Sequence, residues 1–325
     1  MSGEPSANNT RALVESALLS VLVIILYMMD FGTGLLSWLA PIPVSIICLR
    51  HGIGKALMMT IASSLGVGII LGLHNGIFVL TIMAFIGIPV GICLMKNYSN
   101  IKSIPVVALG ILISMALSLL TYTVVAGIPI LSLGNELISI IDMSIDGAIQ
   151  IYESAGLSAD EINVLSQTLV QFKELFLLRF PSMLSLAFCS IAGAYVICTK
   201  FIAKKIGFKY SDTEPLYKWR LPWTFIWGLI LGMFLSVFGN IAKQSILTYI
   251  GSNIVFIFGF VYALQGISIV YFIFNEYKVS NITKVFFIVS IFLFGSIQVM
   301  LSILGLSDIW LDWRTKLSGG IDKKE

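Results

Sequence analysis

Long apolar stretches alternate with short polar connectors along most of the chain. A helix of about 20 residues crosses the ~30 Å hydrocarbon core of a bilayer, and most of these stretches have that length. The pattern therefore predicts an all-α, polytopic transmembrane helical bundle with eight or nine spans. The candidate spans are Ala12–Met29, Leu35–Leu49, Ile53–Leu73, Ile77–Met95, Ile104–Ile128, Pro181–Phe201, Pro222–Phe238, Ile246–Phe274 and Val285–Leu304.

The second stretch is the weakest candidate span. It is short, follows the first stretch with almost no connector, and contains Pro41 and Pro43. Proline removes a backbone donor and clashes with the preceding helical turn. We therefore expect a half-helix or a re-entrant element here, which survives at membrane depth only where protein buries it or it lines a cavity.

Basic residues gather after every second stretch. They are Arg50 and Lys55, then Lys96 and Lys102, then Lys200, Lys204, Lys205, Lys209, Lys218 and Arg220, and finally Lys278 and Lys284. Because cytoplasmic loops carry an excess of lysine and arginine, this alternation predicts a cytoplasmic N-terminus. Nine spans would then place the C-terminus outside, yet the tail holds Arg314, Lys316, Lys323 and Lys324, so the span count stays at eight or nine.

The connector from Ile128 to Arg179 is acidic, and the alternation places it outside the cytoplasm. Ser158 and Glu161 form a capping-box pattern, and apolar residues repeat at helical spacing on both sides of Ala155–Gly156. We expect two amphipathic helices on the membrane surface or over the bundle. They form either a packing hairpin that shields the bundle or a lid over an external site.

These patterns divide the chain into four parts. Residues 1–128 form an N-terminal half of the membrane bundle with five apolar segments, and residues 129–179 form the acidic extracytoplasmic insert. Residues 180–304 supply the C-terminal membrane helices, and residues 305–325 an interfacial helix with a polar tail.

Composition supports a membrane protein. Hydrophobic residues make up 58% of the 325 residues and charged residues 11%, whereas soluble domains carry roughly 25% charged residues. The net charge of +3 gives no indication of nucleic-acid binding. The four cysteines lie far apart in apolar segments, so we expect packing residues, with no disulfide framework and no zinc site.

Glycines four residues apart predict close helix packing, because small residues let helix backbones approach each other in a membrane. This set contains Gly68, Gly72, Gly76, Gly87, Gly91, Gly228 and Gly232.

Ionisable residues at membrane depth mark functional sites by default, and the predicted spans have no acidic residue in their middle. The candidate ligand-binding residues lie at external span ends and in the broken second stretch: Asp30, Trp38, Pro41, Pro43, His74 and Asn75. Together they could line an outward-facing pocket with apolar walls and few polar groups. Alternatively, each is a solvated turn residue.

The segment Gly305–Arg314 (GLSDIWLDWR) pairs Asp308 with Asp312, and Trp310 with Arg314, one helical turn apart. As a helix after the ninth span it would place tryptophan at the membrane interface and Arg314 near a tryptophan face or a lipid phosphate. It is either an interfacial anchor or a docking element for a partner.

Signs of catalysis are missing from the sequence. It has no P-loop, no H-E-x-x-H motif and no Ser/His/Asp cluster, and only two histidines, His51 and His74. We therefore expect no enzyme activity, no cofactor and no catalytic metal.

Three short segments resemble the YybS-like family, a group of bacterial inner-membrane proteins described only as a domain of unknown function. They are Thr10–Ser20 (TRALVESALLS), Ala40–Val44 (APIPV) ahead of Leu49–Gly52 (LRHG), and Gly305–Arg314. The resemblance covers roughly residues 10–316 and implies a multi-pass protein of the bacterial cytoplasmic membrane.

The first half is also similar to the substrate-binding S-components of energy-coupling-factor vitamin transporters. That resemblance implies a six-helix bundle with an external pocket, which borrows an ATPase-driven coupling module. The chain departs from it in length, in its acidic insert and in its first helix, where only Ser16 and Ser20 have the expected small-residue spacing. No binding residue is carried over from that family.

The sequence thus favours an integral membrane protein that binds or moves a small apolar or amphipathic solute. The alternative is a non-transporting scaffold or assembly factor that holds protein partners. The expected partners are the lipid bilayer and either a coupling module or another membrane protein, with no nucleic acid.

Overall fold

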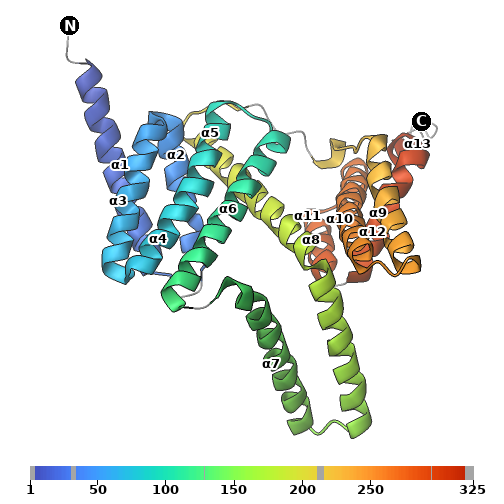
Figure 1. Ribbon diagram of the computed structural model, residues 1–325. Coiled ribbons are helices and arrows are strands. Elements are labelled where there is room, and N and C mark those ends of the chain that lie inside the picture. The colour runs from blue at the N-terminus through green and yellow to red at the C-terminus, as the bar shows by residue number, and fades with distance from the viewer. Residues whose placement is uncertain (1–3, 31–33, 128, 211–215, 294, 319–325) are drawn as a thin grey trace. The chain divides into compact units, whose positions relative to one another are not determined.

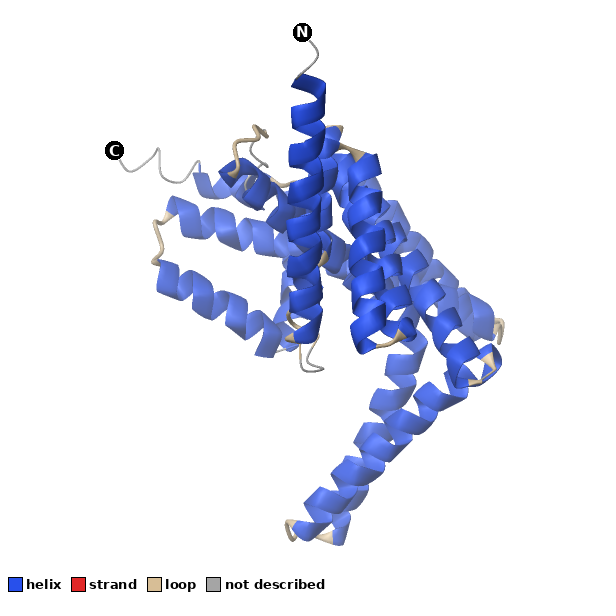
Figure 2. Ribbon diagram, turned by 90° about the vertical axis from the view of Figure 1, so that its left-hand side faces the viewer, coloured by secondary structure: helices blue, strands red, loops and turns tan. Residues whose placement is uncertain are grey.

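The computed structural model describes residues 4–30, 34–127, 129–210, 216–293 and 295–318 (Figure 1). Within these ranges the regular elements are all helices, which confirms the all-α prediction (Figure 2). The α-helices are α1 (Glu4–Met28), α2 (Pro41–His51), α3 (Ile53–Leu71), α4 (Leu73–Ile82), α5 (Ile88–Met95), α6 (Asn100–Ala126), α7 (Leu133–Ser154), α8 (Ala159–Lys205), α9 (Ile226–Ile241), α10 (Ser245–Glu276), α11 (Asn281–Leu293), α12 (Gly295–Leu311) and α13 (Trp313–Ser318).

Seven helical segments of the described chain are long and apolar enough to cross a membrane, or eight if the bent pair α11–α12 counts as one span. This confirms the polytopic bundle. Residue 128, at the end of the fifth predicted span, lies outside the described residues.

The chain forms two compact units. Unit 1 comprises Met1–Ser166 and Ser185–Ser211, and unit 2 comprises Gln167–Leu184 and Asp212–Glu325. Helix α8 contributes to both.

The second predicted span is the short helix α2. Its 11 residues rise about 16 Å at 1.5 Å each, roughly half of the hydrocarbon core. Pro41 and Pro43 lie in its first turn, where backbone N–H groups have no partner within the helix. The prolines therefore start this helix and do not break it.

Helix α2 is central to the core of unit 1. Its Val44, Ile47 and Cys48 are fully buried and pack with Met59 of α3 and Val79 of α4. Gly87 and Gly91 let α2 approach the fourth predicted span closely. A Cβ at Gly87 would lie 3.0 Å from the Pro41 carbonyl oxygen, and one at Gly91 would lie 2.9 Å from that of Ser45.

The fourth predicted span is one helical segment, Leu73–Met95, with a π-helical turn at Met83–Gly87. Pro89 accounts for this turn, because it lacks the N–H that would bond to the Phe85 carbonyl and its ring clashes with that carbonyl. The Ile88 N–H instead bonds to the Met83 carbonyl, five residues back, which is the π-helical pattern.

Helices α3 and α4 form a tight hairpin. A Cβ on Gly76 would lie 2.8 Å from Gly68 Cα, so the two backbones meet there. Gly72 forms the turn itself with a φ of +98°, a left-handed conformation that favours glycine.

The insert contains the predicted capping box, but its second helix is longer than predicted. Ser158 and Glu161 make the reciprocal capping box, and α7 precedes it. The second amphipathic stretch does not end before the sixth apolar stretch, because both belong to the continuous 47-residue helix α8, with Pro181 inside it.

In unit 2, α10 packs against α9 and α12, and glycines of α9 allow α10 to approach closely. A Cβ on Gly232 would lie 3.0 Å from the Val255 nitrogen, and one on Gly228 would overlap the Phe258 ring. The predicted ninth span, Val285–Leu304, corresponds to the pair α11–α12, which is bent by 106°.

The C-terminal segment also differs from the predicted continuous helix. Helix α12 ends at Leu311, Asp312 has a φ of +40°, and α13 starts at Trp313. Trp310 is 66% exposed, whereas Arg314 is only 4% exposed and is enclosed by protein.

Arg314 is instead held by neighbouring protein oxygens. Its guanidinium donates to the carbonyl oxygens of Tyr217 (3.0 Å) and Trp219 (2.7 Å) and to Ser268 Oγ (2.9 Å), and burial lowers the pKa of Arg314. Asp308 is buried nearby and accepts hydrogen bonds from Gln265 Nε2 (2.7 Å) and the Trp313 N–H (3.0 Å).

Candidate functional site

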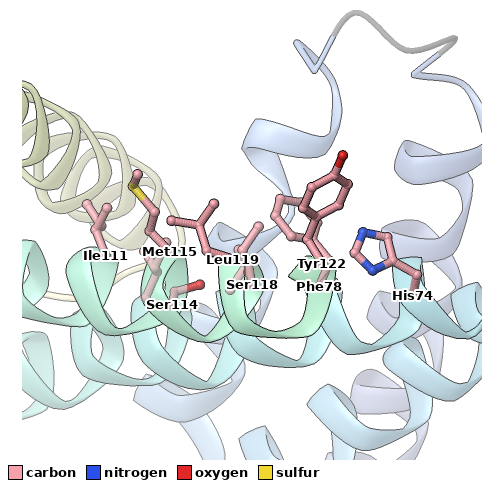
Figure 3. Close-up of a pocket in the computed structure, with 10 residues that line it drawn as sticks. His74, Phe78, Ile111, Ser114, Met115, Ser118, Leu119 and Tyr122 are labelled. Carbon is pink, nitrogen blue, oxygen red and sulfur yellow. The ribbon is translucent and has the colours of Figure 1, made fainter. Parts of the chain in front are cut away.

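A cavity of about 390 Å³ lies in unit 1 between the α4 segment and α6 (Figure 3). One wall consists of residues four apart along the helical segment Leu73–Met95: His74, Phe78, Ile82 and Ile86. The other wall is one face of α6: Ile111, Ser114, Met115, Ser118, Leu119 and Tyr122.

The π-helical turn and a glycine shape this cavity. Ile86 lies within the turn, and the neighbouring Phe85 carbonyl points at Gly110 of α6, so closely that a Cβ on Gly110 would overlap it. The two helices therefore touch through their backbones next to Ile86 and Ile111, which line the cavity.

His74 supplies the most distinctive polar group of the cavity. It lies in the first turn of α4, and not in a loop, because the turn before it is reduced to Gly72. Its ring meets the Tyr122 ring edge-on, with 6.5 Å between the centroids. Its Nδ1 atom is buried and has no hydrogen-bond partner among the described residues.

The remaining polar groups are hydroxyls. Ser118 Oγ lies 3.2 Å from Thr81 Oγ1, which also donates to the Phe78 carbonyl. Ser114 is buried on the same face of α6, and every other wall residue is apolar or aromatic. Such a cavity suits a small apolar or amphipathic molecule with one group that can hydrogen-bond to an imidazole.

The other predicted ligand residues lie elsewhere in unit 1. Asp30 is buried and accepts a hydrogen bond from the Ser37 N–H (3.1 Å). The Trp38 ring packs 5.6 Å from the Tyr195 ring, and the Tyr195 hydroxyl donates to the Trp38 carbonyl (2.9 Å). Neither these residues nor Pro41 and Pro43 line the His74 cavity.

Asn75 is next to His74 but is not a lining residue either. Its side-chain amide donates to the Leu71 carbonyl (2.7 Å) across the α3–α4 turn. Of the six predicted residues, the structure therefore places only His74 in this cavity.

Sequence reasoning missed Ser114, Ser118 and Tyr122. The available signal was their spacing of four residues along one helical face. It also missed an ion cluster in which Glu15 of α1 pairs with Arg50 and His51 at the end of α2. No group of three or more His, Cys, Asp or Glu that could hold a metal occurs in the described part of the chain.

A family model described as "Predicted membrane protein (DUF2232)" matches residues 17–309. No curated protein and no solved structure matches the chain.

Proposed function

The chain belongs to the DUF2232 family of predicted membrane proteins, and we propose that it binds a small apolar or amphipathic molecule in the His74 cavity. One observation carries the proposal: His74 lines this cavity, and its buried Nδ1 atom has no hydrogen-bond partner in the described structure. The proposal is for binding without catalysis.

The volume of the His74 cavity and the chemistry of its lining both favour a bound ligand. The volume of about 390 Å³ falls in the ~300–1,000 Å³ range of small-molecule sites. Leaving a buried donor or acceptor unsatisfied costs about 1–3 kcal/mol. A ligand that hydrogen-bonds to Nδ1 would remove this cost, and its apolar part would cover the walls formed by α4 and α6.

The cavity adjoins the α3–α4 turn, which the alternation of basic connectors places on the external side. In the proposed arrangement, the N-terminus is cytoplasmic in a bacterial cell membrane and the solute arrives from outside. The likeness to S-components stays a prediction, as does an ATPase-driven coupling module. If the chain takes part in transport, such a module would have to supply the energy.

A scaffold or assembly factor is the second candidate function. The observation in its favour is α7, an amphipathic helix with no buried residue among those described. A protein partner could cover its apolar face, as could the membrane surface.

The test is purification of the full chain from native membranes into lipid nanodiscs, followed by mass spectrometry of bound small molecules and proteins. Two variants change the cavity. His74→Phe keeps a ring but removes the nitrogen, and Leu119→Trp enlarges a half-exposed wall residue. Asn75→Ala is the matched control, since Asn75 neighbours His74 without lining the cavity.

We expect one small molecule to be enriched with the wild type and with Asn75→Ala, and to be lost from both cavity variants. A molecule that both cavity variants retain would refute binding at this site. Stable protein partners without any enriched small molecule would favour the scaffold.

A further inference from the structure

A second cavity, of about 530 Å³, lies in unit 2 between α10 and α12 and has a single charged residue in its lining, Arg179. Serine hydroxyls and one amide are the other polar groups: Ser236, Ser252, Ser302 and Gln298. The rest of the lining is apolar or aromatic.

A contact between α8 and α10 lies next to Arg179. The Asn253 side chain of α10 bonds to the α8 backbone: its Oδ1 accepts from the Ser182 N–H (3.1 Å) and its Nδ2 donates to the Leu178 carbonyl (2.8 Å). Asn253 thus joins α8 to α10 one residue away from Arg179.

An aromatic ring also orients the arginine. The guanidinium lies over the Phe256 ring, 5.4 Å from its centroid, so a cation–π contact stabilises it there. Its Nε atom is buried and makes no hydrogen bond within the described residues. A positive group with an unused, desolvated donor beside a cavity attracts an anion.

The apolar part of the cavity is long. Its lining runs from Ser252 to Ile267 along α10, which is about 22 Å at 1.5 Å per residue. One leaflet contributes about half of the ~30 Å hydrocarbon core. Val299 and Ile303 of α12 also line the cavity, and they are 61% and 62% exposed.

We propose that this groove binds one anionic phospholipid, with the phosphate at Arg179 and an acyl chain along α10. The planar guanidinium matches two phosphate oxygens. Charge complementarity favours an anionic head group over a zwitterionic one, because the choline cation of phosphatidylcholine offsets the phosphate charge that would pair with Arg179. From Phe256, whose ring lies against the Arg179 guanidinium, the lining continues along α10 to Ile267, about 17 Å at 1.5 Å per residue, which matches the half-core of one leaflet. The site is independent of the His74 cavity, since the two share no residue.

The experiment is native mass spectrometry of the full chain after its release from nanodiscs. Three nanodisc preparations are compared: anionic phosphatidylglycerol, zwitterionic phosphatidylcholine, and phosphatidylcholine with oleic acid. Arg179→Gln removes the charge at the groove. Arg11→Gln removes the same charge from an exposed position in unit 1. Gly259→Leu fills the groove, since no atom lies within 4 Å of a Cβ at Gly259, and leaves Arg179 unchanged.

We expect one retained phosphatidylglycerol per chain, with about 10- to 100-fold weaker retention in Arg179→Gln, as the loss of a charged hydrogen bond predicts. Gly259→Leu should lose the lipid too, and Arg11→Gln should keep it. Three results would each overturn the proposal. They are equal retention of both phospholipids, retention of oleic acid from its nanodiscs while phosphatidylglycerol is not retained from the others, and wild-type retention of phosphatidylglycerol by Arg179→Gln.

Discussion

Replacing Gly305 with alanine should destabilise unit 2, because α10 and α12 touch there through their backbones. A Cβ at Gly305 would lie 2.7 Å from the Gly266 nitrogen and 3.0 Å from Gln265 Cβ, and it would overlap the Tyr262 carbonyl oxygen. A Cβ at Gly266 would in turn overlap the Leu301 carbonyl oxygen. No side-chain rotamer can relieve a clash with backbone atoms, so the two helices would have to separate.

The magnitude follows from two opposing terms. Alanine is favoured over glycine within a helix by about 1 kcal/mol. Overpacking costs typically about 1–3 kcal/mol, and the upper end applies here, because a gap of 0.5–1 Å forfeits roughly a quarter to a half of each dispersion contact along the interface. The net expectation is a loss of about 2 kcal/mol for Gly305→Ala.

Gly259→Ala on α10 is the matched control. Nothing lies within 4 Å of its Cβ position, so only the helix-propensity gain of up to about 1 kcal/mol remains. Unfolding by SDS in mixed micelles, followed by tryptophan fluorescence, measures both free energies. If Gly305→Ala proves as stable as Gly259→Ala, the backbone contact between α10 and α12 is not as close as the structure shows.

Three further outcomes follow from particular contacts. Gly110→Ala should destabilise unit 1 by about 1–3 kcal/mol in the same assay, because its Cβ would overlap the Phe85 carbonyl; wild-type stability would contradict this close approach. Arg314→Gln should cost about 3–5 kcal/mol, because it breaks a buried set of charged hydrogen bonds; a loss under 1 kcal/mol would show that water satisfies the freed oxygens. Ser158→Ala should raise amide hydrogen exchange at Glu161 and cost the start of α8 about 1 kcal/mol; unchanged exchange would mean that the capping box does not hold that end.

The sequence predicted the helical segments well, because each span must bury enough apolar surface for the bilayer and this requirement is local. It could not predict whether Pro41 and Pro43 would start the helix α2 or interrupt it. The same residue starts a helix in the first turn and breaks it in the middle, and only the structure shows where α2 begins. The bend between α11 and α12 likewise lacks a local signal as plain as proline.

The candidate site was predictable only in part. His74 stood out because ionisable residues near membrane spans are rare. Ser114, Ser118 and Tyr122 did not, since a face with four-residue spacing serves packing as often as binding. Whether these residues line a cavity depends on which face of α6 lies against α4. That orientation is set by the contact between Gly110 and the π-helical turn, and a contact between residues so far apart in the sequence leaves no local signal.

Contacts of the C-terminal segment also indicate on which side of the membrane its basic residues lie. Arg314 and Asp312 bind the segment around Trp219 and Arg220, with 3.3 Å between Arg220 Nη2 and Asp312 Oδ1. Arg314 and Lys316 of α13 therefore lie on the same side of the membrane as the segment around Trp219 that precedes α9. If α9 and α10 each cross once, the chain returns to that side after Glu276, and the bent pair α11–α12 must enter and leave the membrane on one face.

Cysteine accessibility tests this re-entrant arrangement. In a version without the four native cysteines, Lys218→Cys and Lys316→Cys should react with an impermeant reagent from the same side of sealed vesicles, and Lys243→Cys, between α9 and α10, from the opposite side. Both ends of the pair would then share one face, so the basic tail would agree with the other basic connectors under the positive-inside rule. Labelling of Lys316→Cys together with Lys243→Cys would instead make α11–α12 a complete span, and the contacts of Arg314 with the connector could not then form in the membrane.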